Sequence, residues 1–280
     1  MIESIIASIG YAAGIVVDKI TLSKYKVPVM RFIPLLFVWL AIITAIFLPK
    51  YGGFDYSHIS DYKYILLFVL MIVLALTWNI YYYRGIQKEE IHEFELIMLL
   101  SPLVTVLLAG IFLPAERSLT TFIAALVASV ALIATRFRHH HVKIGKIAWM
   151  TIGAMILMSG ESIVIRQLLD VFSPVTLYFT RTAVLALAFI IIYKPKMMVM
   201  KKEAYALTII SAIFGVVQMV LKFYGFKELG VVETTLILVL GPFLVYFFSA
   251  FYFKEKLFKR DILAAIIVIL CVLYVTFGRG

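Results

Sequence analysis

The sequence predicts an all-α, polytopic membrane protein with ten transmembrane helices in two inverted five-helix repeats. Three observations support this prediction: the apolar composition of the chain, the length of its apolar runs, and an internal duplication. Apolar residues make up 64% of the 280 residues and charged residues only 15%, and the mean hydropathy is +1.05. Soluble domains of this length do not reach such values.

The apolar runs have the length of membrane spans. A helix of about 20 residues crosses the roughly 30 Å hydrocarbon core of a bilayer and satisfies its own backbone groups there. The first run starts without a basic segment or a cleavage site, so we expect it to be a retained helix. The ten expected spans are at about 2–22, 29–48, 62–83, 91–112, 119–136, 146–168, 174–193, 204–224, 231–252 and 260–278.

A shift of 140 positions aligns one half of the chain with the other and predicts two repeats, 1–138 and 139–280. It produces six identities over the twenty positions from 83 to 102, several times the chance level. An odd number of spans per repeat inverts the second copy in the membrane, and proteins built this way are transporters with sites between the halves. The identical pairs include Gly85 with Gly225, Glu93 with Glu233, and Pro102 with Pro242.

The basic residues behind the formal net charge of +10 lie in the short loops between apolar runs and form no separate basic domain. This distribution argues against nucleic acid as a partner. Seventeen Lys and Arg residues lie in or beside the gaps after the odd-numbered spans, and five lie on the other side. The positive-inside rule therefore places the odd-numbered loops in the cytoplasm and both termini outside.

Cys271 is the single cysteine and forms no internal disulfide.

Three segments resemble the drug/metabolite transporter superfamily, specifically its EamA-type members with two five-helix repeats. They are LSPLVTVLLAGIFLPAERSL, LGPFLVYFFSAFYFKEKL, and FTRTAVLALAF with Arg181. The resemblance implies a secondary transporter, often an exporter of amino acids or other metabolites, in a bacterial or archaeal plasma membrane. The chain departs from the family where spaced glycines are expected, because Ala124, Ala131, Leu263 and Leu270 stand there.

Ionisable residues inside apolar runs usually face a cavity or a partner, because a charge at a helix centre costs about 2.5–3.5 kcal/mol. Glu161 is the strongest candidate for substrate binding. Desolvation disfavours its charged form, so it could bind and release a proton during transport; a structural pair with Arg166 or Arg181 is the alternative. Arg181 could hold a substrate carboxylate in a bidentate grip or neutralise Glu161.

Two further cations and one acid lie near span ends. For Lys19 and Arg166 we favour snorkelling to the membrane interface. Asp18 points elsewhere around its helix and is expected to be interfacial.

The third and eighth spans carry a matched polar set that we expect to line the substrate cavity. An amide flanked by aromatic rings suits an organic cation or a zwitterion. The alternative for Tyr81, Tyr82 and Tyr83 is an aromatic belt at the interface, which we favour for the tyrosines. The candidate substrate-binding residues of the set are Trp78, Asn79, Tyr82, Gln218 and Lys222.

Several other features have a purely structural interpretation beside the functional one. Pro102 and Pro242 are candidate hinges or static kinks, and Gly10 with Gly14 predicts close helix contact within the bundle or with a second protomer. Glu116 and Glu255 end apolar runs next to basic residues, so interfacial ion pairing is the expected role. The run His139–His141 is expected to be a solvated linker, not a metal site.

These observations predict a secondary active transporter of small polar metabolites, amino acids foremost, driven by protons or another gradient through alternating access. We expect an exporter in the plasma or inner membrane, as a monomer or homodimer. The alternative is a lipid or lipid-linked-sugar flippase of the same architecture. An enzyme is not expected, because no nucleotide or hydrolase motif occurs, and neither is a cofactor or a metal.

Overall fold

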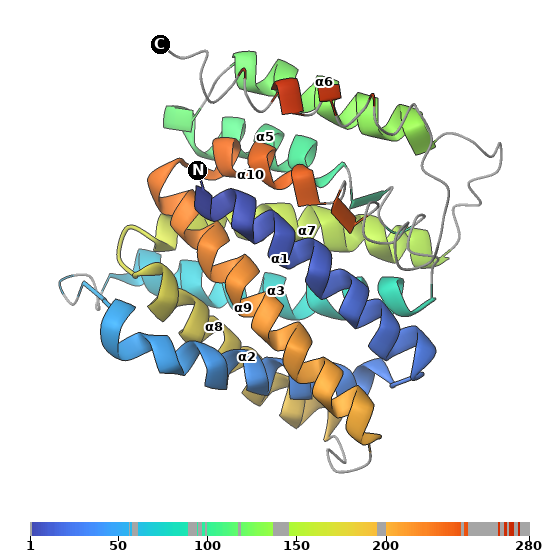
Figure 1. The fold of residues 1–280 in the computed structure, drawn as a ribbon. Helices are drawn as coiled ribbons and strands as arrows, with labels where there is room; N and C mark the ends of the chain where they lie inside the picture. Colours follow the sequence, from blue (N-terminus) through green and yellow to red (C-terminus); the bar gives the residue numbers. More distant parts are fainter. Residues whose placement is uncertain are drawn as a thin grey trace.

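The computed structural model describes residues 2–55, 57, 61–88, 94, 97–98, 100–116, 119–136, 146–194, 200–241, 244–245, 263, 266–267, 269–271 and 274. The regular elements among these residues are helices, which stack into one bundle (Figure 1). They are α1 (Ile2–Lys19), η1 (Ile20–Lys24), α2 (Val29–Tyr51), α3 (Tyr62–Lys88), α5 (Ser101–Phe112), η3 (Pro114–Glu116), α6 (Leu119–Arg136), α7 (Lys146–Leu168), α8 (Pro174–Tyr193), α9 (Lys202–Glu228) and α10 (Val231–Leu238).

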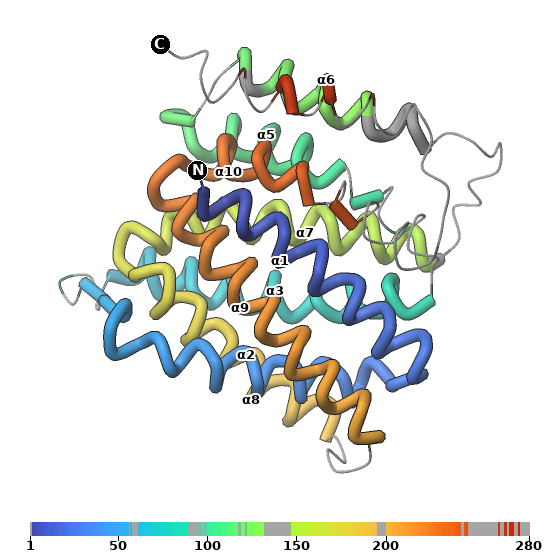
Figure 2. The backbone as a smooth tube through the Cα atoms, in the orientation of Figure 1, coloured from blue at the N-terminus to red at the C-terminus, as the bar shows by residue number. Residues whose placement is uncertain are grey.

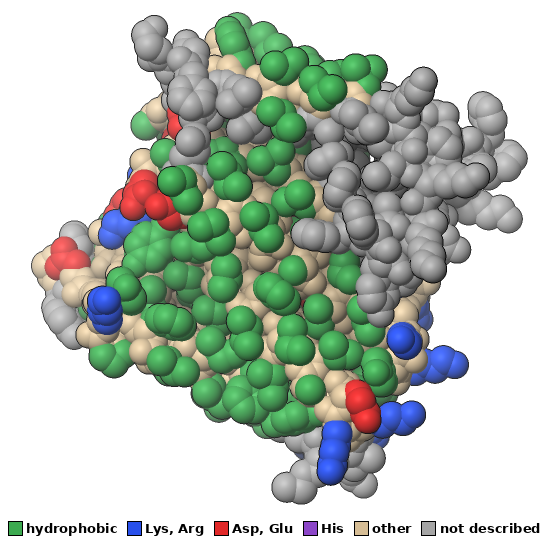
Figure 3. All heavy atoms as spheres, in the orientation of Figure 1, with side chains coloured by type: hydrophobic (Ala, Val, Ile, Leu, Met, Phe, Trp, Pro, Cys, Tyr) green, Lys and Arg blue, Asp and Glu red, His purple; other side chains and the backbone are tan. Residues whose placement is uncertain are grey.

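Six helices of the described chain are long and apolar enough to cross a membrane. They are α1 with its continuation η1, then α2, α3, α7, α8 and α9. Figure 3 shows a face covered by hydrophobic side chains, with Lys, Arg, Asp and Glu gathered near its edges. Large apolar residues are exposed on this scale because lipid, not water, surrounds a transmembrane bundle.

The spans expected at 119–136, 146–168 and 174–193 coincide with α6, α7 and α8. Helices α3 and α9 continue several residues past the expected apolar runs, to Lys88 and Glu228, because polar residues extend a helix beyond the hydrocarbon core. Most of the tenth span lies outside the described residues, as do Glu93, Pro242, Glu255 and His139–His141.

Pro102 does not bend the middle of a long helix in the described chain. It lies at the second residue of α5, in the first turn. A proline there loses no hydrogen bond, because the first backbone N–H groups of a helix have no partner inside it. The structure thus places Pro102 at a helix start, and its role as a hinge stays a prediction.

Three helix pairs make the most extensive contacts of the bundle: α1 with α9, α3 with α7, and α2 with α8. Figure 2 shows α1 and α9 side by side and running in opposite directions. Each pair joins a helix of residues 1–138 to one of residues 139–280, so the two predicted repeats interleave instead of forming separate bundles.

Glycines set the distance between these helices. A Cβ on Gly10 would lie 3.2 Å from the backbone nitrogen of Gln218, and one on Gly14 would lie 3.6 Å from Cβ of Phe214. Gly10 and Gly14 therefore serve a contact within the bundle, with α9, which settles one of the alternatives left open by the sequence.

Gly85 and Gly225 are aligned by the 140-residue shift, and each lies where its helix packs tightly against another. A Cβ on Gly85 would lie 2.7 Å from Oγ1 of Thr151 on α7, and one on Gly225 would lie 2.7 Å from Oγ of Ser4 on α1. The duplicated glycines thus both lie at tight contacts, of α3 with α7 and of α9 with α1.

We expect Gly225→Ala to destabilise the fold by about 1–3 kcal/mol, the usual effect of overpacking a core, because the added methyl group would lie 2.7 Å from side-chain atoms of Ser4 and Thr234, which are both fully buried. Gly160→Ala is the matched control, since no atom of another described helix lies within 4 Å of the added methyl group. Thermal unfolding in detergent measures both; equal loss of stability in the two variants would contradict the packing role of Gly225.

Candidate functional site

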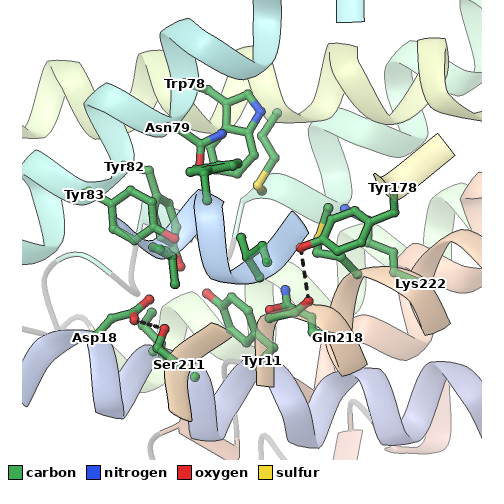
Figure 4. A pocket seen from close by; sticks show the side chains of 18 of the residues that line it. Tyr11, Asp18, Trp78, Asn79, Tyr82, Tyr83, Tyr178, Ser211, Gln218 and Lys222 are labelled. Atoms are coloured by element: carbon green, nitrogen blue, oxygen red, sulfur yellow. Dashed lines mark hydrogen bonds between the residues drawn. The ribbon is translucent and has the colours of Figure 1, made fainter. Parts of the chain in front are cut away.

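A polar cavity of about 90 Å³ lies inside the bundle, enclosed by side chains of α1, α2, α3, α7, α8 and α9 (Figure 4). This volume holds several water molecules. All seven residues predicted to bind substrate line it: Trp78, Asn79, Tyr82, Glu161, Arg181, Gln218 and Lys222. The tertiary fold therefore brings together residues that are up to 144 positions apart in the sequence.

Helix α8 is positioned by the sequence at its start. The side chain of Ser173 accepts a hydrogen bond from the backbone N–H of Thr176 at 3.2 Å, and Pro174 follows in the first turn. Both are standard signals for a helix N-terminus. Arg181 comes two turns later and is only 2% exposed, so its guanidinium enters the core of the bundle.

Glu161 of α7 and Arg181 of α8 form a two-bond ion pair in the wall of the cavity. The Nε of Arg181 donates to Oε1 of Glu161 at 2.6 Å, and a terminal nitrogen donates to Oε2 at 3.2 Å. Glu161 is 1% exposed. In this structure Arg181 neutralises Glu161, as one of the sequence-based alternatives proposed, and the pairing with Arg166 is not formed.

Trp78 of α3 completes the environment of this pair. Its indole Nε1–H donates to Oε2 of Glu161 at 2.6 Å, and the Arg181 guanidinium carbon lies 5.8 Å from the centre of its ring. The indole therefore contacts both charges, the acid through a hydrogen bond and the cation through its π face.

The neighbours of Trp78 are also inside the bundle. The amide nitrogen of Asn79 donates to the carbonyl of Ala75 at 2.8 Å, one turn earlier in α3. The ring of Tyr82 packs edge-on against Trp78, with centroids 5.7 Å apart. Tyr82 and Tyr83 are each only 8% exposed and line the cavity, so the interfacial belt favoured for them is wrong.

Lys222 and Gln218 lie where the first cavity meets a second one, also of about 90 Å³. The Lys222 ammonium lies 5.1 Å from the ring centre of Phe226. Hydroxyl groups of Ser101, Thr105, Ser162 and Thr235 surround the second cavity, and Tyr11 and Met158 form its border with the first together with Gln218 and Lys222. Pro102 lines the second cavity as well.

Asp18 is another residue that the sequence analysis placed wrongly. It is 6% exposed, lines the cavity, and accepts a hydrogen bond from the hydroxyl of Ser211 on α9 (Figure 4). The signal was present in the sequence, because Tyr11, Gly14 and Asp18 are spaced by three and four residues and share one face of α1.

Lys19 and Arg166, for which snorkelling stays a prediction, each have a partner in the described chain. The Lys19 ammonium donates to the carbonyl of Ile86 at 2.7 Å, at the end of α3. Arg166 contacts Glu116 at 3.5 Å and pairs with Asp170 at 2.9 Å. Glu116 also accepts from the backbone N–H of Val232 at 3.1 Å, which neutralises the positive end of α10.

Ser211 and Tyr178 are cavity residues that the sequence analysis missed. The hydroxyl of Tyr178 lies 3.5 Å from the carbonyl of Gly215 and reaches across from α8 to α9. A serine and a tyrosine in apolar helices are common, and no sequence feature distinguishes these two from their neighbours.

The chain was compared with known families, proteins and structures. The model of a family described as the EamA-like transporter family matches it twice, over residues 1–137 and 145–277. No curated protein sequence matches it. A solved structure described as "Crystal structure of protein" is similar, with a TM-score of 0.74 and 16% identity over 97% of this chain and 98% of that one. At this identity the likeness shows the fold alone.

Nearly the whole chain is covered by the two matches, in agreement with the motifs around Pro102, Arg181 and Glu116. The chain therefore belongs to the EamA-like transporter family and is a multi-pass membrane transporter.

Proposed function

We propose that this protein is a secondary active transporter that exports small zwitterionic metabolites, amino acids foremost, by alternating access. The observation that carries the proposal is the buried Glu161–Arg181 pair in the wall of a polar cavity. Each charge inside the membrane costs about 2.5–3.5 kcal/mol on insertion scales. A pair of apolar residues would stabilise the bundle at least as well, so we infer that the pair is kept for binding.

A zwitterion suits this pair for an electrostatic reason. When the pair opens, Arg181 can hold a carboxylate with two parallel hydrogen bonds, and Glu161 is left to face an ammonium group. Two ion pairs then replace one, and no charge is left unpaired in the low dielectric of the site. A ligand with a single charge would leave one of the two residues without a partner.

Neutral groups around the pair would select the rest of the substrate. Trp78, Tyr82 and Tyr178 offer ring surfaces for an apolar or aromatic side chain, and Asn79 and Gln218 offer amides. The second cavity, with its hydroxyl groups and Lys222, gives a larger or more polar substrate room to extend.

For the transport cycle we propose that residues 1–138 and 139–280 form two inverted repeats that rock against each other. The contacts of α1 with α9 and of α3 with α7 support this proposal. The 140-residue shift aligns α1 with α7 and α3 with α9, so exchanging the halves turns one of these contacts into the other. We further propose a plasma-membrane location with the basic odd-numbered loops in the cytoplasm, from the distribution of Lys and Arg.

The direct test is counterflow with the purified protein in liposomes. Labelled proteinogenic L-amino acids are offered one at a time, with an uncharged sugar and a fluorescent phospholipid as further probes. Uptake of one or more zwitterions is expected. Movement of the phospholipid with no amino acid uptake would replace the proposal with the flippase.

We expect Glu161→Gln and Arg181→Gln each to lose transport and to lower stability by about 3–5 kcal/mol, because each leaves one buried charge alone. The double variant Glu161→Gln/Arg181→Gln should recover most of the stability and none of the transport. Unfolding in detergent and counterflow in liposomes measure the two effects. Additive losses of stability in the double variant would mean that the two side chains are not coupled.

We expect Trp78→Phe to reduce the transport rate at least about tenfold, since a hydrogen bond to a charged group is worth about 1.5–3 kcal/mol and 1.4 kcal/mol is a factor of ten. The change keeps an aromatic ring but removes the donor to Glu161. Trp39→Phe is the matched control, because the indole nitrogen of Trp39 has no hydrogen-bond partner among the described residues and its ring does not line the cavity. Equal transport rates in the two variants would show that the Trp78 donor is dispensable.

A further inference from the structure

Glu161 is poorly suited to carry a proton in this structure. Its two carboxylate oxygens accept hydrogen bonds from Arg181 at 2.6 and 3.2 Å and from Trp78 at 2.6 Å. A proton on either oxygen would displace one of these three donors. Proton coupling therefore needs another group.

Asp18 has the opposite environment. It is buried and faces the same cavity, but no Lys, Arg or His nitrogen of the described chain lies within ion-pair distance of its carboxylate. Its hydrogen bond comes from a neutral group, the hydroxyl of Ser211. A buried acid without a cation is the kind of group that takes up a proton readily, because burial penalises only its charged form.

The groups that face Asp18 from the neighbouring helices do not supply a cation for its carboxylate. From α3 the titratable groups in the same cavity are the phenols of Tyr82 and Tyr83, which are neutral at ordinary pH, and α9 contributes Ser211. Arg181 of α8 is occupied by Glu161, and Lys222 is eleven residues from Ser211, about 16 Å along α9 at 1.5 Å per residue. Lys19, next to Asp18 on α1, gives its ammonium to the carbonyl of Ile86.

The backbone after Asp18 is also unusual. The chain leaves α1 at Lys19 and continues as a π-helix over Ile20–Lys24. Such wide turns are rare, and they occur frequently at functional sites, where they change the direction of side chains. Here the wide turn begins two residues after the acid, at the end of α1.

We propose that Asp18, with Ser211, is a proton-binding site that couples transport to a proton gradient, separate from the Glu161–Arg181 pair that holds the substrate. The hydrogen bond of Asp18 joins α1 of one predicted repeat to α9 of the other. Uptake of a proton turns the acceptor carboxylate into a neutral carboxyl and changes this link between the halves. The coupling role rests on the proposed transport function; proton binding itself does not.

Proton binding is tested without any substrate, by infrared difference spectra of the purified protein in lipid nanodiscs over a pH titration. The carbonyl stretch of a buried protonated carboxyl should appear on acidification in the wild type and in Glu161→Gln, and should be missing in Asp18→Asn. Its presence in Asp18→Asn, or its absence from the wild type, would overturn the assignment. Size-exclusion profiles check the fold of each variant.

A second pair of variants covers the case in which Asp18→Asn does not fold. Ser211→Ala removes the donor and should shift the midpoint of the band by about one pH unit, the equivalent of one hydrogen bond to a charged group. Thr208→Ala is its control one turn earlier on α9, since the hydroxyl of Thr208 bonds only to its own helix. An unchanged midpoint in Ser211→Ala would contradict the site.

Coupling is tested in liposomes with an amino acid that the wild type takes up in counterflow. Asp18→Asn should remove the dependence of its flux on an imposed pH gradient, and the control Asp170→Asn, an exposed acid at the end of α7, should keep it. A wild-type flux indifferent to the gradient would overturn the coupling role and leave the transport function standing. No uptake of any amino acid would defeat the transport function, and the infrared titration would still decide whether Asp18 binds a proton.

Discussion

The ion pair between Glu161 and Arg181 constrains the centre of this protein more than any other contact. Two charged groups that are almost fully buried in an apolar bundle must remain paired, because either one alone would destabilise the fold strongly. The pair fixes α7 against α8, and the indole of Trp78 adds α3 to the same cluster. Three helices are thereby held at one point, and the polar cavity exists beside that point.

Small residues supply the second constraint. Apolar side chains gain little from leaving lipid for a helix interface, so packing and close approach decide which transmembrane helices associate. Gly10 and Gly14 let α9 pack closely against α1, and Gly85 lets α7 pack closely against α3. The polar cavity lies between these two close pairs, and its lining comes from helices of both predicted repeats.

Two acids of the same cavity differ in what surrounds them. In the described part of the chain, Glu161 has a guanidinium and an indole as donors, and Asp18 has a single serine hydroxyl. This difference follows from the tertiary arrangement and not from the side chains themselves, which have the same chemistry. The roles proposed above, substrate charge for Glu161 and a proton for Asp18, rest on this difference, a division of roles common where two carboxyl groups share a site.

Much of the fold was predictable because a membrane imposes simple rules on a sequence. Apolar runs of the right length become helices, and α6, α7 and α8 have the predicted bounds. The family was predictable from short motifs around Pro102 and Arg181. The cavity residues Trp78, Asn79 and Gln218 were predictable because a polar group in an apolar helix must face something other than lipid.

By itself the sequence determined the class of protein, the family and most of the polar residues that face the cavity. Only the tertiary structure decided which of these residues pair. Asp18 could not be recognised from α1 alone, since its partner Ser211 is 193 positions away and its burial depends on how closely Gly10 lets α9 approach. The physical reason is that local periodicity fixes the face of a helix on which a residue lies, whereas charge pairing depends on distances between helices that no local pattern encodes.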